Sequence, residues 1–235
     1  DKKGDLMETG QLVAALATGV HANRVLFQPH DVSPYECDGL TMFKAKPKVV
    51  VLPETRDEVC HVLRTCKALG VPVVARGAGT GLSGGALPHA EGVLLVMAKF
   101  NRILDVDADA RIARVEPGVR NLAISEAVSD LNLYYAPDPS SQIACSIGGN
   151  IAENSGGVHC LKYGLTVHNV LSITIALDDG SVVTVGSDAL DSAGYDLLAL
   201  TIGSEGLLAV VLEVTVRLLP KPEEMRVVMA AFDDV

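Results

Sequence analysis

Apolar runs and a helical repeat alternate in the first third of the chain. The run of valines and leucine at 49–52 is uninterrupted, which predicts a buried strand. Apolar residues then recur at helical spacing from 59 to 69, and Thr55 and Glu58 have the spacing of a capping box at the start of that helix. A second apolar run at 71–75 completes a strand–helix–strand unit. Ligands bind at the carboxyl edge of such a sheet, so the segment that follows is the first candidate for a site.

Beyond the first third, the pattern is that of antiparallel strands joined by polar turns. The elements expected are a strand at 92–97, a hairpin at 103–118, a helix at 121–131, a second hairpin at 170–185 and a strand at 211–219. In the last strand Glu213, Thr215 and Arg217 alternate with aliphatic residues, which predicts one face in solvent. The predicted fold class is therefore α+β: a small β-α-β part with parallel strands, and a larger, mostly antiparallel sheet with flanking helices.

The same pattern divides the chain into three parts. Residues 1–46 are expected to form an N-terminal arm with a short helix near 11–17. Residues 47–220 are expected to form one main domain of two subdomains, with their boundary near 105–120. Residues 221–235 end in an apolar run that predicts a strand with no partner after it, so we expect a linker and the start of a truncated C-terminal domain.

Charge and cysteine content narrow the class of protein. The 235 residues include 19 Lys and Arg against 29 Asp and Glu, a net charge of −10 that argues against a nucleic-acid partner. Five cysteines without a CxxC pair are typical of reduced thiols in a cytoplasmic protein. The polar N-terminal residues do not resemble a signal peptide, and charged residues interrupt the apolar region at 197–219. We therefore expect no membrane insertion by this chain.

Five glycines crowd the segment from Ala75 to Pro88, directly after the second strand. Gly79, Gly81 and Gly84 match the dinucleotide-binding pattern GxGxxG, but that pattern must open a helix. The next strand follows too soon for a crossover helix, and no Lys-Ser/Thr pair follows the glycines as in a Walker A loop. A turn without a ligand is one alternative. An anion-binding nest of backbone N–H groups explains the glycine density better.

A second segment rich in glycine, serine and asparagine occupies residues 134–166. Glycine pairs at 148–149 and 156–157 flank a short stretch of helical character, and Asn150 and Asn154 supply amide groups. So long a segment without regular structure needs a functional explanation in a compact domain. Backbone and side-chain amides with hydroxyls over this length suit a long, flat, polar cofactor.

The chain carries four motifs in order: ARGAGTGLSGGALP, PDPSSQIACSIGGNIAENSGG, KYG and IGSEGLLAVVLEVTVRLLPKP. Together they resemble the FAD-binding domain of the vanillyl-alcohol-oxidase-type FAD-linked oxidases and, within that family, its glycolate-oxidising subunits. The resemblance implies an FAD held between two α/β subdomains. The backbone of residues 76–81 would wrap the diphosphate, which fits the expectation that main-chain N–H groups hold it without a lysine cluster.

The resemblance also implies which residues lie along the cofactor. They are Arg76, Gly77, Ala78, Gly79, Thr80, Gly81, Ser83, Pro137, Asp138, Ser141, Ser146, Gly148, Gly149, Asn150, Ala152, Ser155, Gly156, Gly157, Tyr163, Gly164, Glu205, Gly206 and Val211. Arg76 is either a phosphate partner or an ion-pairing loop residue. Relatives that bind FAD covalently through this loop carry a histidine where Thr80 stands, which implies noncovalent FAD here.

No metal site is expected. His159, Cys160 and His168 fit no usual ligand spacing, so structural or flavin-adjacent roles are predicted for them. The family's substrate pocket and catalytic bases belong to a C-terminal cap domain, and the sequence therefore names no catalytic base.

The implied reaction is the oxidation of a small 2-hydroxy acid, glycolate to glyoxylate, with electrons passed to an acceptor other than NAD. A second flavin subunit and an iron–sulfur subunit are the implied partners. Through them a cytoplasmic protein would reach the inner membrane as a peripheral complex. Three alternatives stay open: D-lactate or 2-hydroxyglutarate as substrate, a noncatalytic flavin-binding subunit, and an NAD dehydrogenase.

Overall fold

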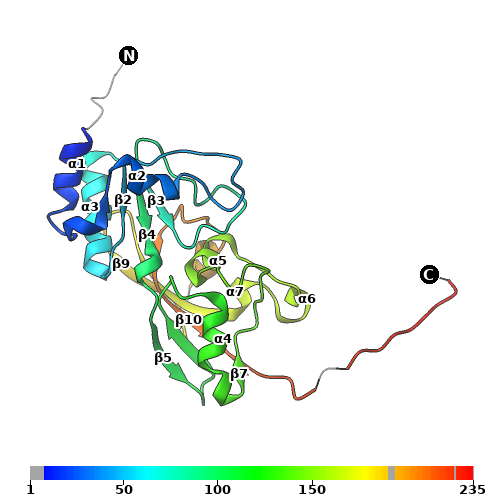
Figure 1. Ribbon diagram of the computed structural model, residues 1–235. Coiled ribbons are helices and arrows are strands. Elements are labelled where there is room, and N and C mark those ends of the chain that lie inside the picture. Colours follow the sequence, from blue (N-terminus) through cyan, green and yellow to red (C-terminus); the bar gives the residue numbers. More distant parts are fainter. Residues whose placement is uncertain (1–7, 190–193, 225, 235) are drawn as a thin grey trace.

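The computed structural model describes residues 8–189, 194–224 and 226–234, which are built around two β-sheets (Figure 1). The smaller sheet has the strand order β1-β2-β4-β3. Its strands are β1 (Val25–Leu26), β2 (Val49–Val51), β3 (Val73–Arg76) and β4 (Val93–Val96). The helical elements that belong to this half are α1 (Thr9–Leu16), α2 (Pro29–Val32), α3 (Arg56–Leu69) and the 3₁₀ turns η1 (Ala22–Arg24), η2 (Ser33–Tyr35) and η3 (Met97–Lys99).

Three strands of the smaller sheet run parallel, and apolar side chains cover both of its faces. β2 and β3 each pair with β4, which therefore lies between the two strands of the predicted unit. Val49 and Leu95 belong to the core that contains α1 and α3. Val50 and Leu94 pack on the opposite face with Val32 of α2. Burial on both faces explains why these strands are uninterrupted apolar runs.

Helix α3 has both of its predicted end signals. Thr55 Oγ1 accepts a hydrogen bond from the Glu58 N–H at 3.3 Å, and the Glu58 carboxylate accepts one from the Thr55 N–H at 3.3 Å. At the other end Gly70 has a φ of 65°, and the Val71 N–H donates to the Cys66 carbonyl. The Val71 N–H is part of this cap, so it does not pair in the sheet. Strand β3 therefore begins at Val73, two residues later than the sequence predicted.

Replacing Thr55 by alanine removes the hydroxyl acceptor of this capping box. We expect the free energy of unfolding to fall by about 1 kcal/mol, because the Glu58 N–H loses its partner at the helix start. Urea unfolding followed by circular dichroism measures the change. Thr55→Ser keeps the hydroxyl and is the control, so a serine variant as unstable as the alanine variant would contradict the capping role.

The larger sheet is antiparallel throughout and has the order β5-β6-β10-β8-β9. Its strands are β5 (Ile103–Asp107), β6 (Ile112–Val115), β8 (Val170–Ala176), β9 (Val182–Gly186) and β10 (Val210–Arg217). A separate pair joins β7 (Leu133–Tyr134) to β11 (Leu219–Pro220). The helical elements of this half are α4 (Asn121–Ala127), η4 (Ser129–Leu131), α5 (Ile147–Glu153), α6 (Cys160–Tyr163), α7 (Thr166–Asn169) and α8 (Leu197–Thr201). The predicted α+β fold class is confirmed.

Two predictions for this half are wrong in detail. The helix expected at 121–131 ends at Ala127, and a 3₁₀ turn follows it up to Asn132, which adopts a left-handed φ of 57°. Thr215, predicted to face solvent, is only 4% exposed. Its strand β10 is the central strand of the sheet, with β6 and β8 on its two sides, so alternation along this strand does not report exposure.

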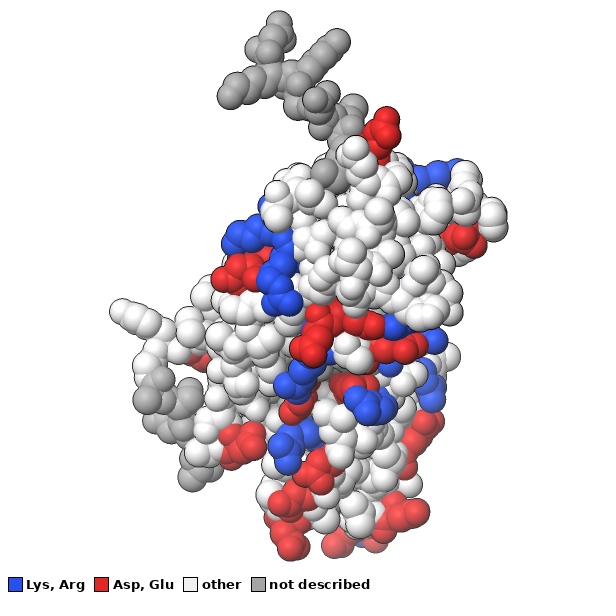
Figure 2. Space-filling view, turned by 90° about the vertical axis from the view of Figure 1, so that its left-hand side faces the viewer, with Lys and Arg blue, Asp and Glu red and all other residues white. Residues whose placement is uncertain are grey.

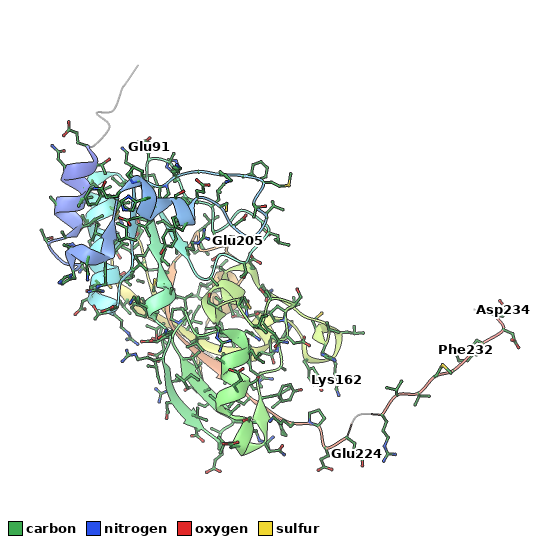
Figure 3. All side chains as sticks on the ribbon, viewed as in Figure 1. Glu91, Lys162, Glu205, Glu224, Phe232 and Asp234 are labelled. Carbon is green, nitrogen blue, oxygen red and sulfur yellow. The ribbon has the colours of Figure 1, made fainter. Side chains whose placement is uncertain are left out.

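The apolar segment near the C-terminus forms no strand within the described residues 226–234. Figure 1 shows it extending away from both sheets, and Figure 3 places Phe232 and Asp234 on this extension. Val227, Val228 and Met229 are at least 89% exposed. The strand predicted here is absent because none of the described strands lies beside this segment to pair with it. The division of the chain into arm, main domain and C-terminal segment stays a prediction.

Charged side chains of both signs are intermixed over the middle of the face shown in Figure 2. Many of the charges are paired between elements: Lys67 Nζ lies 2.8 Å from Asp178 Oδ2, and Arg114 Nη2 lies 3.0 Å from Asp105 Oδ2. This side of the molecule therefore carries mixed charge rather than one basic field. Among the described residues, no helix has the length and apolar character needed to cross a bilayer.

Candidate cofactor-binding cleft

A cleft opens between the two halves of the molecule, at the carboxyl end of β3. It encloses about 970 Å³ of empty space, its open side included. The loop after β3 forms one wall, and α5 with the loop before β10 forms the other. Glu205, labelled in Figure 3, lies beside α5, where its N–H donates to the Ala152 carbonyl at 2.8 Å.

Most of the residues singled out by the sequence line this cleft. They are Arg76, Gly77, Ala78, Gly79, Thr80, Gly81, Ser141, Ser146, Gly148, Gly149, Asn150, Ala152, Ser155, Glu205, Gly206 and Val211. They come from segments more than 100 residues apart in the sequence, which the two sheets bring together.

The loop after β3 is an irregular turn, and residues 77–92 contain no helix. The rejection of a dinucleotide-binding crossover helix is therefore confirmed. Gly79 has a φ of 72°, a left-handed conformation that favours glycine. A Cβ on Gly77 would collide with the Ser146 hydroxyl of the opposite wall. The glycines thus allow this backbone to turn sharply and to approach α5 closely.

Arg76 is held by backbone carbonyl groups. Its Nη1 donates to the Cys37 carbonyl at 2.8 Å and to the Ala86 carbonyl at 3.1 Å. Its guanidinium carbon lies 6.0 Å from the ring centre of Tyr35. Burial lowers the pKa of this guanidinium. The partners of this guanidinium within the described residues are carbonyl groups and not carboxylates, which contradicts the ion-pair alternative, and its role as a phosphate partner stays a prediction.

The opposite wall is organised by hydrogen bonds between side chains. The Ser146 hydroxyl accepts from the Gly149 N–H at 3.3 Å and caps α5. The Asn150 Nδ2 donates to Asn121 Oδ1 at 2.9 Å, and the Asn121 Nδ2 donates to the Pro137 carbonyl at 2.8 Å. Both amides are buried, and the Asn150 Nδ2 group joins α5 to α4, while contact of Asn150 with the cofactor stays a prediction.

Two carboxylates line the cleft opposite the glycine loop, on Glu153 and Glu205. Burial, followed by the nearby charges of Glu205 and Asp38, raises the pKa of Glu153. Neither wall contributes a lysine, and Arg76 is the cleft's one cationic side chain among the described lining residues. The polar groups available to a ligand are therefore backbone N–H donors on the glycine loop and carboxylate acceptors facing it.

The remaining predicted residues lie outside the cleft as the described residues bound it. They are Ser83, Pro137, Asp138, Gly156, Gly157, Tyr163 and Gly164. Several of them surround α6. Asp138 Oδ2 lies 2.6 Å from His159 Nδ1, and Tyr163 meets Tyr134 edge to face with 6.2 Å between ring centres. Whether they contact the cofactor stays a prediction.

The sequence interpretation missed other residues of the cleft. They are Ala75, Gly85, Ala86, Met97, Pro117, Cys145, Ile151, Glu153, Thr201, Ser204, Ala209 and Val210. The second of the four motifs contains Cys145, Ile151 and Glu153. Only their position in that motif could have indicated that they line the cleft. Ser204 likewise lies in the fourth motif, whereas Thr201, the last residue of the apolar helix α8, lies outside all four motifs and carries no such signal.

The five cysteines are all free thiols. Cys66 is 1% exposed on the apolar face of α3, and burial raises the pKa of its thiol to about 12, which makes it a packing residue as predicted. His168 Nδ1 accepts a hydrogen bond from the Leu165 N–H at 3.0 Å, and His159 pairs with Asp138. Both histidines thus have structural partners.

This set of groups fits FAD. A diphosphate is recognised by clustered backbone N–H donors where glycines allow close approach, and the loop after β3 supplies such a backbone. Carboxylates such as those of Glu153 and Glu205 accept hydrogen bonds from sugar hydroxyl groups.

A family model described as FAD binding domain matches residues 47–186, and the chain belongs to this family. FAD is its cofactor. The resemblance inferred from the four motifs is confirmed.

Two similar proteins and one solved structure show which known proteins this chain resembles. The chain is 62% identical over 224 residues to the glycolate oxidase subunit GlcD of Escherichia coli (strain K12), a match that covers 95% of this chain and 45% of the relative. It is 42% identical over 185 residues to a D-lactate dehydrogenase of Archaeoglobus fulgidus, covering 78% of this chain and 41% of that one. A solved structure of alkyldihydroxyacetonephosphate synthase shares the fold, with a TM-score of 0.81 and 20% identity over 93% of this chain and 42% of that chain. The chain spans less than half the length of these relatives.

Proposed function

We propose that this chain is the FAD-holding part of a glycolate oxidase, an FAD-dependent oxidoreductase that converts glycolate to glyoxylate. The observation that carries the proposal is the 62% identity to a glycolate oxidase subunit over 95% of the chain. The substrate class is then a small 2-hydroxy acid. The electrons pass to an acceptor other than NAD, as the resemblance to glycolate oxidase subunits implies.

In this proposal the chain's residues bind and orient the cofactor. The backbone of residues 76–81 holds the diphosphate, while Ser146 and Gly149 support it from the opposite wall. Thr80 offers no imidazole for a covalent link, so the cofactor is held noncovalently. FAD, when bound, supplies the acceptor for the two electrons removed from the substrate.

A second candidate is a D-lactate dehydrogenase, which the 42% identity to such an enzyme supports. The lower identity makes it the weaker candidate. A D-2-hydroxyglutarate dehydrogenase of Xanthomonas citri is 34% identical over 224 residues, and supports a third 2-hydroxy acid in the same way. A noncatalytic flavin-binding subunit would share the cleft and lack turnover.

We also propose how the domains of the whole protein are arranged, which subunits it binds and where it lies in the cell. The N-terminal arm proposed at 1–46, of which residues 1–7 lie outside the described residues, contributes β1 to the smaller sheet of the FAD-binding domain at 47–220. Residues 221–235 lead into a cap domain that carries the substrate pocket. The whole protein assembles with a second flavin subunit and an iron–sulfur subunit. It is cytoplasmic, and any contact with the inner membrane is made through those partners.

The test is anaerobic flavin reduction in the full-length protein that contains this chain. We expect a yellow protein that releases FAD on denaturation and whose absorbance near 450 nm bleaches fastest with glycolate. D-lactate, D-2-hydroxyglutarate and NADH are the matched comparisons. Fastest bleaching by another acid would overturn the substrate, no bleaching by any acid would favour the noncatalytic subunit, and flavin retained by denatured protein would overturn the noncovalent attachment.

A further inference from the structure

A short loop outside the family match contacts the glycine loop, which forms one wall of the cofactor cleft. This docking loop, residues 36–45, is closed at its base by the Ala45 N–H, which donates to the Glu36 carbonyl at 2.8 Å. The Lys44 Nζ lies 2.7 Å from Glu36 Oε1 and reinforces the same closure. The family match begins only at residue 47, so family membership assigns this loop no part in FAD binding.

The tip of the docking loop is hydrogen-bonded to the glycine loop. Asp38 is 6% exposed, and its Oδ2 accepts from the Gly84 N–H at 3.0 Å while its Oδ1 accepts from the Leu40 N–H at 3.0 Å. The Gly39 N–H donates to the Gly81 carbonyl at 3.0 Å. One buried carboxylate thus ties the two loops together.

The two backbones are also in close steric contact. A Cβ on Gly39 would lie 2.7 Å from the Thr80 carbonyl oxygen, closer than real Cβ atoms approach such an atom. Only glycine allows the docking loop to lie at this distance.

Arg76 fastens the base of the same contact. Its guanidinium joins the Cys37 carbonyl, next to the docking loop's tip, to the Ala86 carbonyl at the far end of the glycine loop. The side chains of Arg76 and Asp38 therefore fix the glycine loop by hydrogen bonds to its backbone. A lysine could carry the charge here but not the planar array of donors.

We propose that the docking loop is a positioning element for FAD: Asp38, Gly39 and Arg76 hold the backbone of residues 77–84 in the conformation that binds the diphosphate. The inference rests on the FAD binding described above, and it does not depend on which acid is oxidised. A preformed loop binds more tightly because less conformational freedom is lost on binding.

The proposal and simple electrostatics predict opposite changes in FAD affinity when the charge of Asp38 is removed. Asp38 places a negative charge beside a loop that receives a dianionic group, so electrostatics alone would make Asp38→Asn bind FAD more tightly. If the carboxylate positions the loop, the amide variant binds FAD more weakly. Glu91 provides the control: it is a carboxylate on the segment that follows the glycine loop, it lies outside the lining of the cleft, and its Oε2 lies 2.6 Å from Lys48 Nζ.

The experiment measures FAD dissociation constants of the full-length apoprotein by fluorescence titration. We expect Asp38→Asn, Gly39→Ala and Arg76→Lys each to weaken binding about tenfold, and Glu91→Gln to leave it unchanged. Cleavage after Lys44 and Lys46 by a lysine-specific protease should accelerate in the first three variants, because the loop detaches. Melting temperatures identify any variant that fails to fold, and Arg76→Lys is the mildest of the three.

Several outcomes would overturn the proposal. Asp38→Asn binding FAD as tightly as the parent would do so, as would Arg76→Lys binding at parental affinity, because retained charge would then be sufficient. A parent protein that binds FAD but is not reduced by glycolate refutes the proposed substrate and leaves this inference standing.

Discussion

Gly77→Val is expected to abolish detectable FAD binding at micromolar cofactor concentrations. The Cβ of any side chain at this position collides with the Ser146 hydroxyl, which itself caps α5. The walls must then separate or the cap must break. Overpacking of this kind costs about 3 kcal/mol, which corresponds to about a 100-fold loss of affinity. FAD fluorescence titration of the full-length apoprotein measures the loss.

The control for this variant is Gly10→Val in α1, where an added Cβ meets no atom within 4 Å. It should bind FAD like the parent. If Gly77→Val binds FAD within a few-fold of the parent, the close approach of the two walls is not required for the cofactor.

Asn121→Ala is expected to lower the free energy of unfolding by about 3 kcal/mol. The substitution leaves the buried Asn150 Nδ2 without its acceptor and the Pro137 carbonyl without its donor, and each unpaired buried group costs roughly 1–3 kcal/mol. FAD binding should weaken as well, because Asn150 lines the cleft. Urea unfolding and FAD titration measure the two effects.

A double variant tests whether Asn121 and Asn150 stabilise the fold through their shared hydrogen bond. Asn121→Ala with Asn150→Ala should cost less than the sum of the single changes, because the two amides share one hydrogen bond. Asn101→Ala, at an exposed position, should change the unfolding free energy by no more than about 0.5 kcal/mol. Strict additivity of the double variant would contradict the coupling.

The sequence correctly predicted the structural features that depend on only a few adjacent residues. The capping box of α3 and its glycine stop occur as predicted, because they depend only on neighbours within one helical turn. The rejection of a Rossmann helix held for the same reason: the spacing between the glycines and β4 leaves no room for one. The exposure of Thr215 could not be read this way, because it depends on which strands flank β10.

The role of Arg76 shows the same limit at the site. The sequence offered a phosphate partner or an ion pair, and both assume that a cation is there to meet a negative charge. Within the described residues its partners are instead the carbonyls of Tyr35, Cys37 and Ala86, and a contact with phosphate stays a prediction. Backbone carbonyls are present at every residue, so no residue type in the sequence marks them as a binding site for a guanidinium.

By itself, the sequence determined the α+β class, the ends of α3 and the glycine loop, because spacing and residue type carry these, and the resemblance of its four motifs to a known family implied FAD. The tertiary structure alone decided that α5 forms the opposite wall, that Asn121 supports Asn150, and that the docking loop fastens the glycine loop through Asp38. Those contacts join residues 29 and 46 positions apart along the chain. Such distant pairs meet only after two sheets and their helices have packed, which no local pattern encodes.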